Sequence, residues 1–320
     1  MGHSLEENMK VAHFTHEASD GKSIYVRLWL PTGEPRAIIL IAHGMAEHGA
    51  RYERFAERLT AKGYAVYVPD DRGHGKTAAT PAELGYFADK EGFRRVIEDD
   101  HEIAKLAQEA YPGLPLFLFG HSMGSFVSQG YIALYGENLS GCVLSGTSGP
   151  MPAAMLGGGK AVAAIGCLFK GRHALAPLAN RLSFGSYNDA FKPTRTEFDW
   201  LSRDPAEVDK YVADPLCGFV CTYGFFKDFL AGLSFIHRPE VMARIPKSLP
   251  LFLVAGSADP VGAASGSVDA LAASYRKLGI ARVDEKLYEG AHHEILNETN
   301  RDEVMDDIVA WLEERRKAVK

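Results

Sequence analysis

The sequence has few cysteines and no excess of positive charge, the features that would indicate a disulfide-rich or a nucleic-acid-binding protein. Its 320 residues include only four cysteines, and the net charge is −6. So few cysteines give no disulfide framework, and we expect Cys142, Cys167, Cys217 and Cys221 to be buried free thiols. The spacing of Cys217 and Cys221 could place both on one helix face, but two ligands are too few for a metal site. Because the chain has no basic stripe that would neutralise phosphates, we expect no nucleic-acid partner.

Long apolar runs are also scarce. The segment from Met1 to Lys10 lacks the apolar stretch of a secretion signal, so we expect a cytoplasmic protein. The most apolar window runs from Met151 to Phe169, but it contains three consecutive glycines, 157–159, and is only marginally long enough to cross a bilayer. We interpret this window as a loop followed by a buried helix.

The chain does contain a regular alternation of strand and helix patterns. The run 37–42 (AIILIA) is apolar throughout, which is typical of a strand buried on both faces of a parallel sheet. Alternation of such runs with helical periodicity predicts an α/β domain with a mostly parallel central sheet flanked by helices. The predicted strands are 11–17, 23–30, 37–42, 64–68, 116–119, 141–145, 251–255 and 283–288, and the predicted helices are 52–59, 96–110, 124–135 and 304–312.

This alternation fails between residues 149 and 237. The stretch is rich in Gly, Ala, Pro and aromatic residues, and it contains no clear buried strand. The simplest account is one α/β core, residues 11–148 and 238–316, interrupted by a largely helical insertion at 149–237 that caps it.

The segment Gly120-His121-Ser122-Met123-Gly124 matches the pattern G-x-S-x-G of a nucleophile elbow. It directly follows the predicted strand 116–119 and opens a predicted helix, which is the context that gives the pattern meaning. Both glycines are needed because side chains there would collide with the neighbouring strand and helix. We therefore expect Ser122 to be a nucleophile; the alternative is a glycine-rich turn with a spectator serine.

A serine nucleophile needs a base, and the base needs an orienting carboxylate. Asp259 follows the predicted strand 251–255, and His292 and His293 follow the strand 283–288, which gives the chain order Ser, Asp, His. Only one of these histidines can be the base, and the spacing does not choose between them. The candidate donors to an oxyanion are the backbone N–H groups of Met123 and of Met45, which follows the strand 37–42.

With these motifs, the sequence resembles the monoacylglycerol lipase/lysophospholipase family of α/β-hydrolases, whose members are also described as serine aminopeptidase-like hydrolases. The resemblance extends from about Val11 to Leu312. It rests on the segments 43–52 (HGMAEHGARY), 70–75 (DDRGHG), 120–124 (GHSMG), 214–216 (DPL) and 256–259 (GSAD).

This resemblance implies the α/β-hydrolase fold and a cap over an apolar acyl tunnel. It also implies that His293, three residues after Gly290, completes a triad with Ser122 and Asp259, and that Met45 and Met123 donate to the oxyanion. His292 beside the base and the glycine-rich start of the cap depart from the family pattern. The expected reaction is hydrolysis of a carboxylic ester through an acyl-enzyme, which requires no cofactor and no metal.

The expected substrates are lipid-like monoesters with an apolar acyl chain, such as monoacylglycerols or lysophospholipids, and we expect the cap to contact membrane surfaces transiently. A short-chain carboxylesterase and a peptidase that cleaves N-terminal residues are the alternatives.

The peptidase would need an acidic cluster in the cap, for which the candidates are Asp199, Asp204, Glu207 and Asp209. A non-catalytic binding protein would be expected to have lost a triad member. The sequence leaves the oligomeric state open.

Two further groups of residues allow two interpretations each. The apolar stripe within 161–169 and the Phe- and Leu-rich segment 223–235 either line an acyl tunnel or form the core of the cap. Glu47, His48 and Arg51 either bind polar substrate groups or hold the oxyanion loop in place, and we favour the second. For Arg72 and His74 we likewise expect a structural role, because glycine-rich turns need side chains that satisfy backbone groups.

Overall fold

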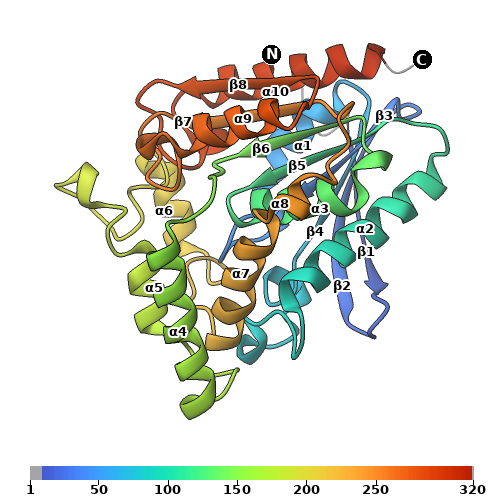
Figure 1. Cartoon of the computed structure of the whole chain (residues 1–320). Coiled ribbons are helices and arrows are strands. Elements are labelled where there is room, and N and C mark those ends of the chain that lie inside the picture. The colour runs from blue at the N-terminus through green and yellow to red at the C-terminus, as the bar shows by residue number, and fades with distance from the viewer. Residues whose placement is uncertain (1–8, 319–320) are drawn as a thin grey trace.

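Eight strands form a single sheet within residues 9–318, which are the residues that the computed structural model describes (Figure 1). The strand order is β1-β2-β4-β3-β5-β6-β7-β8. The β1–β2 and β2–β4 pairs are antiparallel, and the other pairs are parallel. The strands are β1 (Met9–Glu17), β2 (Ser23–Pro31), β3 (Ala37–Ala42), β4 (Tyr64–Pro69), β5 (Leu116–His121), β6 (Gly141–Ser145), β7 (Leu251–Gly256) and β8 (Val283–Tyr288).

All eight predicted strands are confirmed, with ends that differ by at most two residues. Four predicted helices are also confirmed: α1 (Glu53–Thr60), α2 (Gly92–Ala110), α3 (Met123–Tyr135) and α10 (Arg301–Ala318). The helix α9 (Ser267–Lys277) is not among the predicted helices, although its buried residues follow a helical spacing. The prediction about a secretion signal at Met1–Lys10 falls almost wholly outside the described residues.

Helices cover both faces of the sheet, and the alternation of side chains along each strand explains how. Ile38 and Leu40 of β3 pack in the cluster that contains α2, α3 and α9. Ile39 and Ile41 point the other way, into the cluster that contains α1 and α10. Burying each such side chain stabilises the fold by about 1.5–3 kcal/mol. A strand apolar at every position is therefore what this doubly covered sheet requires.

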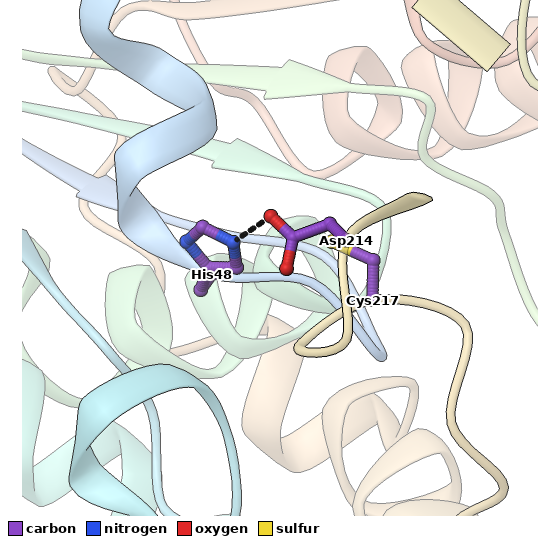
Figure 2. Close-up of side chains that lie close together, drawn as sticks. All are labelled: His48, Asp214 and Cys217. Atoms are coloured by element: carbon purple, nitrogen blue, oxygen red, sulfur yellow. Dashed lines mark hydrogen bonds and ion pairs between the residues drawn. The ribbon is translucent and has the colours of Figure 1, made fainter. Parts of the chain in front are cut away.

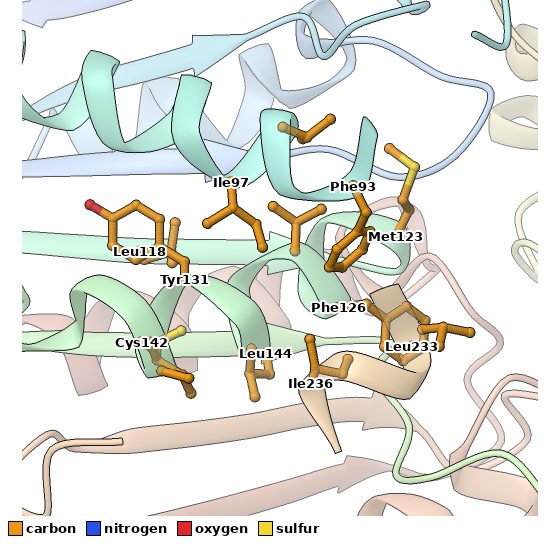
Figure 3. Packing of buried hydrophobic residues seen from close by; sticks show 14 of the residues in the cluster. Phe93, Ile97, Leu118, Met123, Phe126, Tyr131, Cys142, Leu144, Leu233 and Ile236 are labelled. Atoms are coloured by element: carbon orange, nitrogen blue, oxygen red, sulfur yellow. The ribbon is translucent and has the colours of Figure 1, made fainter. Parts of the chain in front are cut away.

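The predicted cap, residues 149–237, lies between β6 and β7 and contains α4 (Ala153–Lys170), α5 (Pro177–Phe184), α6 (Pro205–Ala213) and α7 (Tyr223–Ile236); the short α8 (Pro239–Met242) follows it. The Thr222 hydroxyl caps α7 by accepting from the N–H of Phe225 (3.1 Å). Figure 3 shows Leu233 and Ile236 of α7 facing the side chains of α3, Phe126 among them. The segment 223–235 therefore forms core between the cap and the sheet domain.

For the window from Met151 to Phe169, the prediction of a helix is confirmed, but the prediction that this helix is buried is wrong. The helix α4 exists, but Ile165, Leu168 and Phe169 are 58%, 78% and 80% exposed. Its buried residues are Ala163 and Gly166, which face α7. The stripe within 161–169 thus forms an outer apolar surface of the cap instead of its core or a tunnel, because helical periodicity does not specify what covers an apolar face.

The prediction for the cysteines is confirmed in part. All four are free, and Cys142 and Cys221 are buried, but Cys167 and Cys217 are only half-buried. Cys217 and Cys221 do not share a helix face, because both precede α7 in the linker after α6. Pro215 and a left-handed Gly218 (φ 69°) keep that linker irregular.

Two carboxylates lie buried in the core beside the sheet. The side-chain oxygens of Asp100 on α2 have no hydrogen-bond partner among the described residues, and neither has Oδ2 of Asp71. Burial, reinforced by neighbouring carboxylates, raises the pKa of both groups well above the usual 3.8. Both side chains therefore take up a proton more readily in the folded protein than an exposed aspartate does.

This burial predicts that the contribution of Asp100 to stability falls as the pH rises. Unfolded aspartate ionises near pH 3.8, so above that pH the unfolded state is favoured until the folded group also ionises. Asp100→Asn cannot ionise in either state. We expect its free energy of unfolding, relative to the wild type, to increase between pH 5 and pH 8 by on the order of 1 kcal/mol. Urea unfolding at both pH values measures this difference, and parallel pH profiles for the two proteins would contradict it.

Candidate active site

Ser122 lies at the turn between β5 and α3, and its backbone has the conformation of a tight strand-to-helix turn. Its φ and ψ are 53° and −117°, a strained conformation for a residue other than glycine. A Cβ at Gly124 would overlap the carbonyl oxygen of Ala42, and one at Gly120 would overlap that of Gly124. The turn is thus packed directly against the end of β3, as the elbow interpretation of the two glycines requires.

Asp259 and His293 meet after the ends of β7 and β8. Nδ1 of His293 lies 2.9 Å from Oδ2 of Asp259, and both side chains are almost fully buried. The other carboxylate oxygen, Oδ1, accepts from the N–H of Val261 (2.8 Å). Burial by itself would lower the pKa of His293, but the Asp259 carboxylate, together with Glu294 and Glu47, outweighs burial and raises the pKa above 6.5. The pair therefore has the geometry of an oriented general base.

The adjacent His292 points elsewhere. Its Nδ1 lies 2.9 Å from the carbonyl oxygen of Asp199, and its ring centroid is 3.9 Å from that of Phe191. The residue spacing left the choice between the two histidines open, and the family resemblance implied His293. The structure gives only His293 a carboxylate partner.

Two aromatic rings lie against the candidate base, His293. The ring of His121, the neighbour of Ser122, lies 4.8 Å from the His293 ring, which places the elbow and the base at one edge of the sheet. Burial and the nearby His293 lower the pKa of His121 to about 4, so it stays neutral. The ring of Trp200 in the cap lies 5.0 Å from the His293 ring, and the backbone carbonyl oxygen of Trp200 accepts from the backbone N–H of His293 at 3.3 Å. No sequence motif indicates Trp200, because it lies in an irregular part of the cap.

The two candidate oxyanion donors lie on neighbouring backbones. Met123 is the first residue of α3, where N–H groups have no partner within the helix. The loop that carries Met45 leaves β3 beside Gly124, whose close approach to Ala42 and His43 brings the two segments together. The Glu47 carboxylate accepts from the N–H of Gly44 and so holds the start of this loop.

Glu47 belongs to a buried network that connects this loop to the base. Arg51 binds Glu47 and makes two hydrogen bonds of 2.6 Å to Glu294, the residue after His293. Tyr52 donates to Glu47 at 2.8 Å. Although burial would raise the pKa of Glu47, Arg51 and its other neighbours lower it to about 2, so the carboxylate is ionised. These contacts support the structural interpretation of Glu47 and Arg51.

Arg72 and His74 are likewise engaged within the fold. Arg72 is bound by Asp99 (2.6 Å) and Asp20 (2.7 Å), and the His74 ring contacts the Arg72 carbonyl oxygen at 3.0 Å. Both side chains are buried. They fix the turn after β4, as expected from the sequence.

His48, Asp214 and Cys217 form the one cluster of three metal-ligating side chains found among the described residues, with donor atoms within 4.8 Å of one another (Figure 2). Nδ1 of His48 accepts from the N–H of Ala50 (3.3 Å), so its Nε2 carries the proton and donates to Asp214 (2.9 Å). A metal bound at Nε2 would move that proton to Nδ1, where it would face the N–H of Ala50, another donor. The donors present therefore fit a hydrogen-bonded pair better than a metal site.

The sheet topology, the strained serine elbow and the buried Asp–His pair together define a serine hydrolase of the α/β-hydrolase fold. A family model described as "Serine aminopeptidase, S33" matches residues 33–300. The chain belongs to this family of hydrolases, and it is a carboxylic ester hydrolase.

Relatives of known name cover nearly the whole chain. The sequence is 30% identical over 295 residues to a monoacylglycerol lipase of Mycolicibacterium smegmatis, covering 91% of this chain and 93% of the relative. It is 30% identical over 314 residues to human monoglyceride lipase, covering 93% and 89%. The crystal structure of a thermostable carboxyl esterase from Bacillus coagulans in complex with glycerol superposes with a TM-score of 0.87 at 31% identity, covering 96% of this chain and 99% of that one. These similarities confirm the family that the sequence motifs indicated.

The positions of the two histidines predict opposite outcomes for their substitution. His293→Ala removes the histidine paired with Asp259, and we expect kcat for p-nitrophenyl butyrate to fall by at least about a thousandfold. His292→Ala loses only its contacts with Asp199 and Phe191, and most of the activity should remain. Labelling by a fluorophosphonate, located by mass spectrometry, should be on Ser122 in the wild type. A reversed pattern of losses would assign the base to His292.

Proposed function

We propose that this enzyme hydrolyses monoacylglycerol- or lysophospholipid-type lipid monoesters. The observation that carries the proposal is the likeness, over about nine-tenths of the chain, to lipases of monoacylglycerols. The apolar outer face of the cap supports it, since an enzyme of this kind must meet substrates that reside in membranes.

In the proposed mechanism, the Ser122 hydroxyl attacks the ester carbonyl while His293 takes its proton. The N–H groups of Met45 and Met123 stabilise the oxyanion that forms. The carbon–oxygen bond to the alcohol then breaks, and His293 protonates the departing alcohol. Water attacks the resulting acyl-enzyme along the reverse path, releasing the fatty acid, while Asp259 keeps the imidazole oriented throughout.

We further propose a cytoplasmic enzyme whose cap touches membrane surfaces transiently. Seven apolar side chains on α4, on α5 and between them are more than half exposed: Met155, Ile165, Leu168, Phe169, Leu175, Leu178 and Leu182. Exposed apolar groups gathered in this way indicate contact with a membrane or a partner. By length and composition alone α4 could cross a bilayer, but its packing against α7 supports a helix that lies on the surface.

The peptidase alternative finds less support, because each acidic side chain of the cap that it would use already has a partner. Asp204 binds Arg301 (2.8 Å), Glu207 binds Arg54 (2.8 Å), and Asp209 binds Arg195. Asp199 accepts from the hydroxyl of Thr196 (2.6 Å). An ammonium group of a peptide would therefore have to displace existing contacts.

The lipid proposal predicts a particular dependence on acyl length. Each methylene buried adds about 0.8 kcal/mol of binding, or roughly fourfold in affinity. We expect kcat/KM for p-nitrophenyl esters to rise from two carbons toward roughly eight to twelve and then level off. The series should be measured beside aminoacyl anilides, with Ser122→Ala as the background. A maximum at two carbons would indicate a short-chain esterase, and preferred cleavage of the anilides would indicate a peptidase.

The membrane proposal is tested by placing charge on the outer face of the cap. The double variant Leu168→Glu/Phe169→Glu should reduce co-sedimentation with phosphatidylcholine vesicles by at least about tenfold, since two large apolar side chains would no longer be buried in lipid. Hydrolysis of p-nitrophenyl acetate should be unchanged. The charge-matched control is Val11→Glu/Leu106→Glu, which alters exposed apolar residues of the core domain. Equal sedimentation of the two double variants would contradict the proposal.

A further inference from the structure

The oxyanion loop contains a residue in a conformation that the rest of the protein must hold. Ala46, directly after the candidate donor Met45, has a φ of 54°, in the left-handed region. For an alanine this costs about 1–2 kcal/mol relative to ordinary backbone. Ala46 is also buried. Its conformation therefore depends on contacts from outside the loop.

Those contacts come from the cap. The carbonyl oxygen of Ala46 accepts two hydrogen bonds, from the N–H of Gly218 (2.9 Å) and from the hydroxyl of Tyr211 (3.0 Å). Tyr211 lies in the last turn of α6, and Gly218 lies in the following linker. The Tyr211 ring also lies under the guanidinium of Arg51, at 4.8 Å. The segment 211–218 of the cap thus docks directly on the loop that carries Met45.

The His48–Asp214 pair fastens the same two segments together. His48 lies two residues after Ala46, and its Nε2–H donates to Oδ2 of Asp214 in the linker (2.9 Å; Figure 2). Oδ1 of Asp214 accepts from the N–H of Leu216 (2.8 Å), which shapes the turn that presents Gly218 to Ala46. One carboxylate therefore both forms this turn and binds the oxyanion loop.

We propose that His48 and Asp214 are positioning residues, which form a latch through which the docked cap sets the oxyanion loop for catalysis. This inference rests on the oxyanion donors and the ester hydrolysis proposed above. The core side of the loop is held by Glu47, and the cap side is held by the latch. If the linker lifts, Ala46 loses both hydrogen bonds and its backbone relaxes, so the Met45 N–H no longer points at the developing oxyanion.

Loss of this latch would change the kinetics differently from loss of a residue that only lines the acyl-binding site. Oxyanion stabilisation acts on the transition state of every ester, so its loss lowers kcat equally for short and long acyl chains. Loss of a wall of the acyl site would instead raise KM, and would do so more for long chains. The two roles are therefore separated by comparing p-nitrophenyl acetate with p-nitrophenyl octanoate.

Asp214→Asn tests the latch with little change of shape. The variant keeps an oxygen for the N–H of Leu216 but presents an amide to His48, which removes the acceptor. The matched control is Asp204→Asn. Asp204 also joins the cap to the core, through Arg301, and also uses Oδ1 locally, to accept from the N–H of Ala206 (3.0 Å). It does not contact the oxyanion loop.

We expect Asp214→Asn to lower kcat about tenfold for both esters, with KM within about twofold of the wild type, while Asp204→Asn stays near wild type. A trifluoromethyl ketone, which forms an oxyanion with the serine, should bind Asp214→Asn about tenfold more weakly. His48→Ala should match Asp214→Asn, and His48→Gln, which retains a donor, should recover part of the rate. Combining His48→Ala with Asp214→Asn should add no further loss, because both remove one interaction.

Three results would overturn the latch: equal effects of Asp214→Asn and Asp204→Asn, a loss confined to octanoate, or a loss confined to KM. If circular dichroism shows that Asp214→Asn is unfolded, the His48 variants decide, and wild-type kcat in a folded His48→Ala overturns the proposal. Ester hydrolysis by the wild type and its absence in Ser122→Ala test the proposed function separately. Failure of the latch is thus distinguishable from failure of the function.

Discussion

The candidate active site depends on the close approach of the Gly124 backbone to the end of β3. Only a residue without a side chain lets the start of α3 lie against Ala42 and His43. That contact places the strained Ser122 at the tip of its turn, and it brings the N–H of Met123 beside the loop that carries Met45. The nucleophile and both proposed oxyanion donors therefore share one backbone contact, and a methyl group at position 124 would separate them.

Buried charge maintains the rest of the site. Asp259 and His293 form a hydrogen bond out of reach of solvent, and Arg51 joins Glu47 to Glu294, the residue after His293. Removing such groups from water is costly, and it is tolerated here because each carboxylate has a cationic or hydrogen-bonding partner. The network connects the loop after β3 with the loop after β8, so the proposed oxyanion donor and the base are held by the same set of interactions.

The cap has an apolar outer face and a polar inner linker, and these two faces suit different tasks. The outer side chains of α4 and α5 are exposed where a lipid surface could bury them. The linker after α6 instead contacts Ala46 and His48 of the core. A movement of the cap that admits substrate would therefore also act on the proposed oxyanion loop, which would couple substrate entry to the chemistry.

The sequence by itself determined the sheet and the identity of the candidate site, because both depend on local patterns. Strands buried on both faces must be apolar throughout, and an elbow between strand and helix must have its glycines, so 37–42 and 120–124 could be interpreted without tertiary information. The choice between His292 and His293 needed the family resemblance, and only the structure shows which one meets Asp259. The exposure of α4, the cover that Trp200 gives the base and the His48–Asp214 pair were decided by tertiary structure alone. The last two join residues far apart in the chain, and helical periodicity or residue type does not specify which neighbour, if any, an apolar face or an irregular segment will meet.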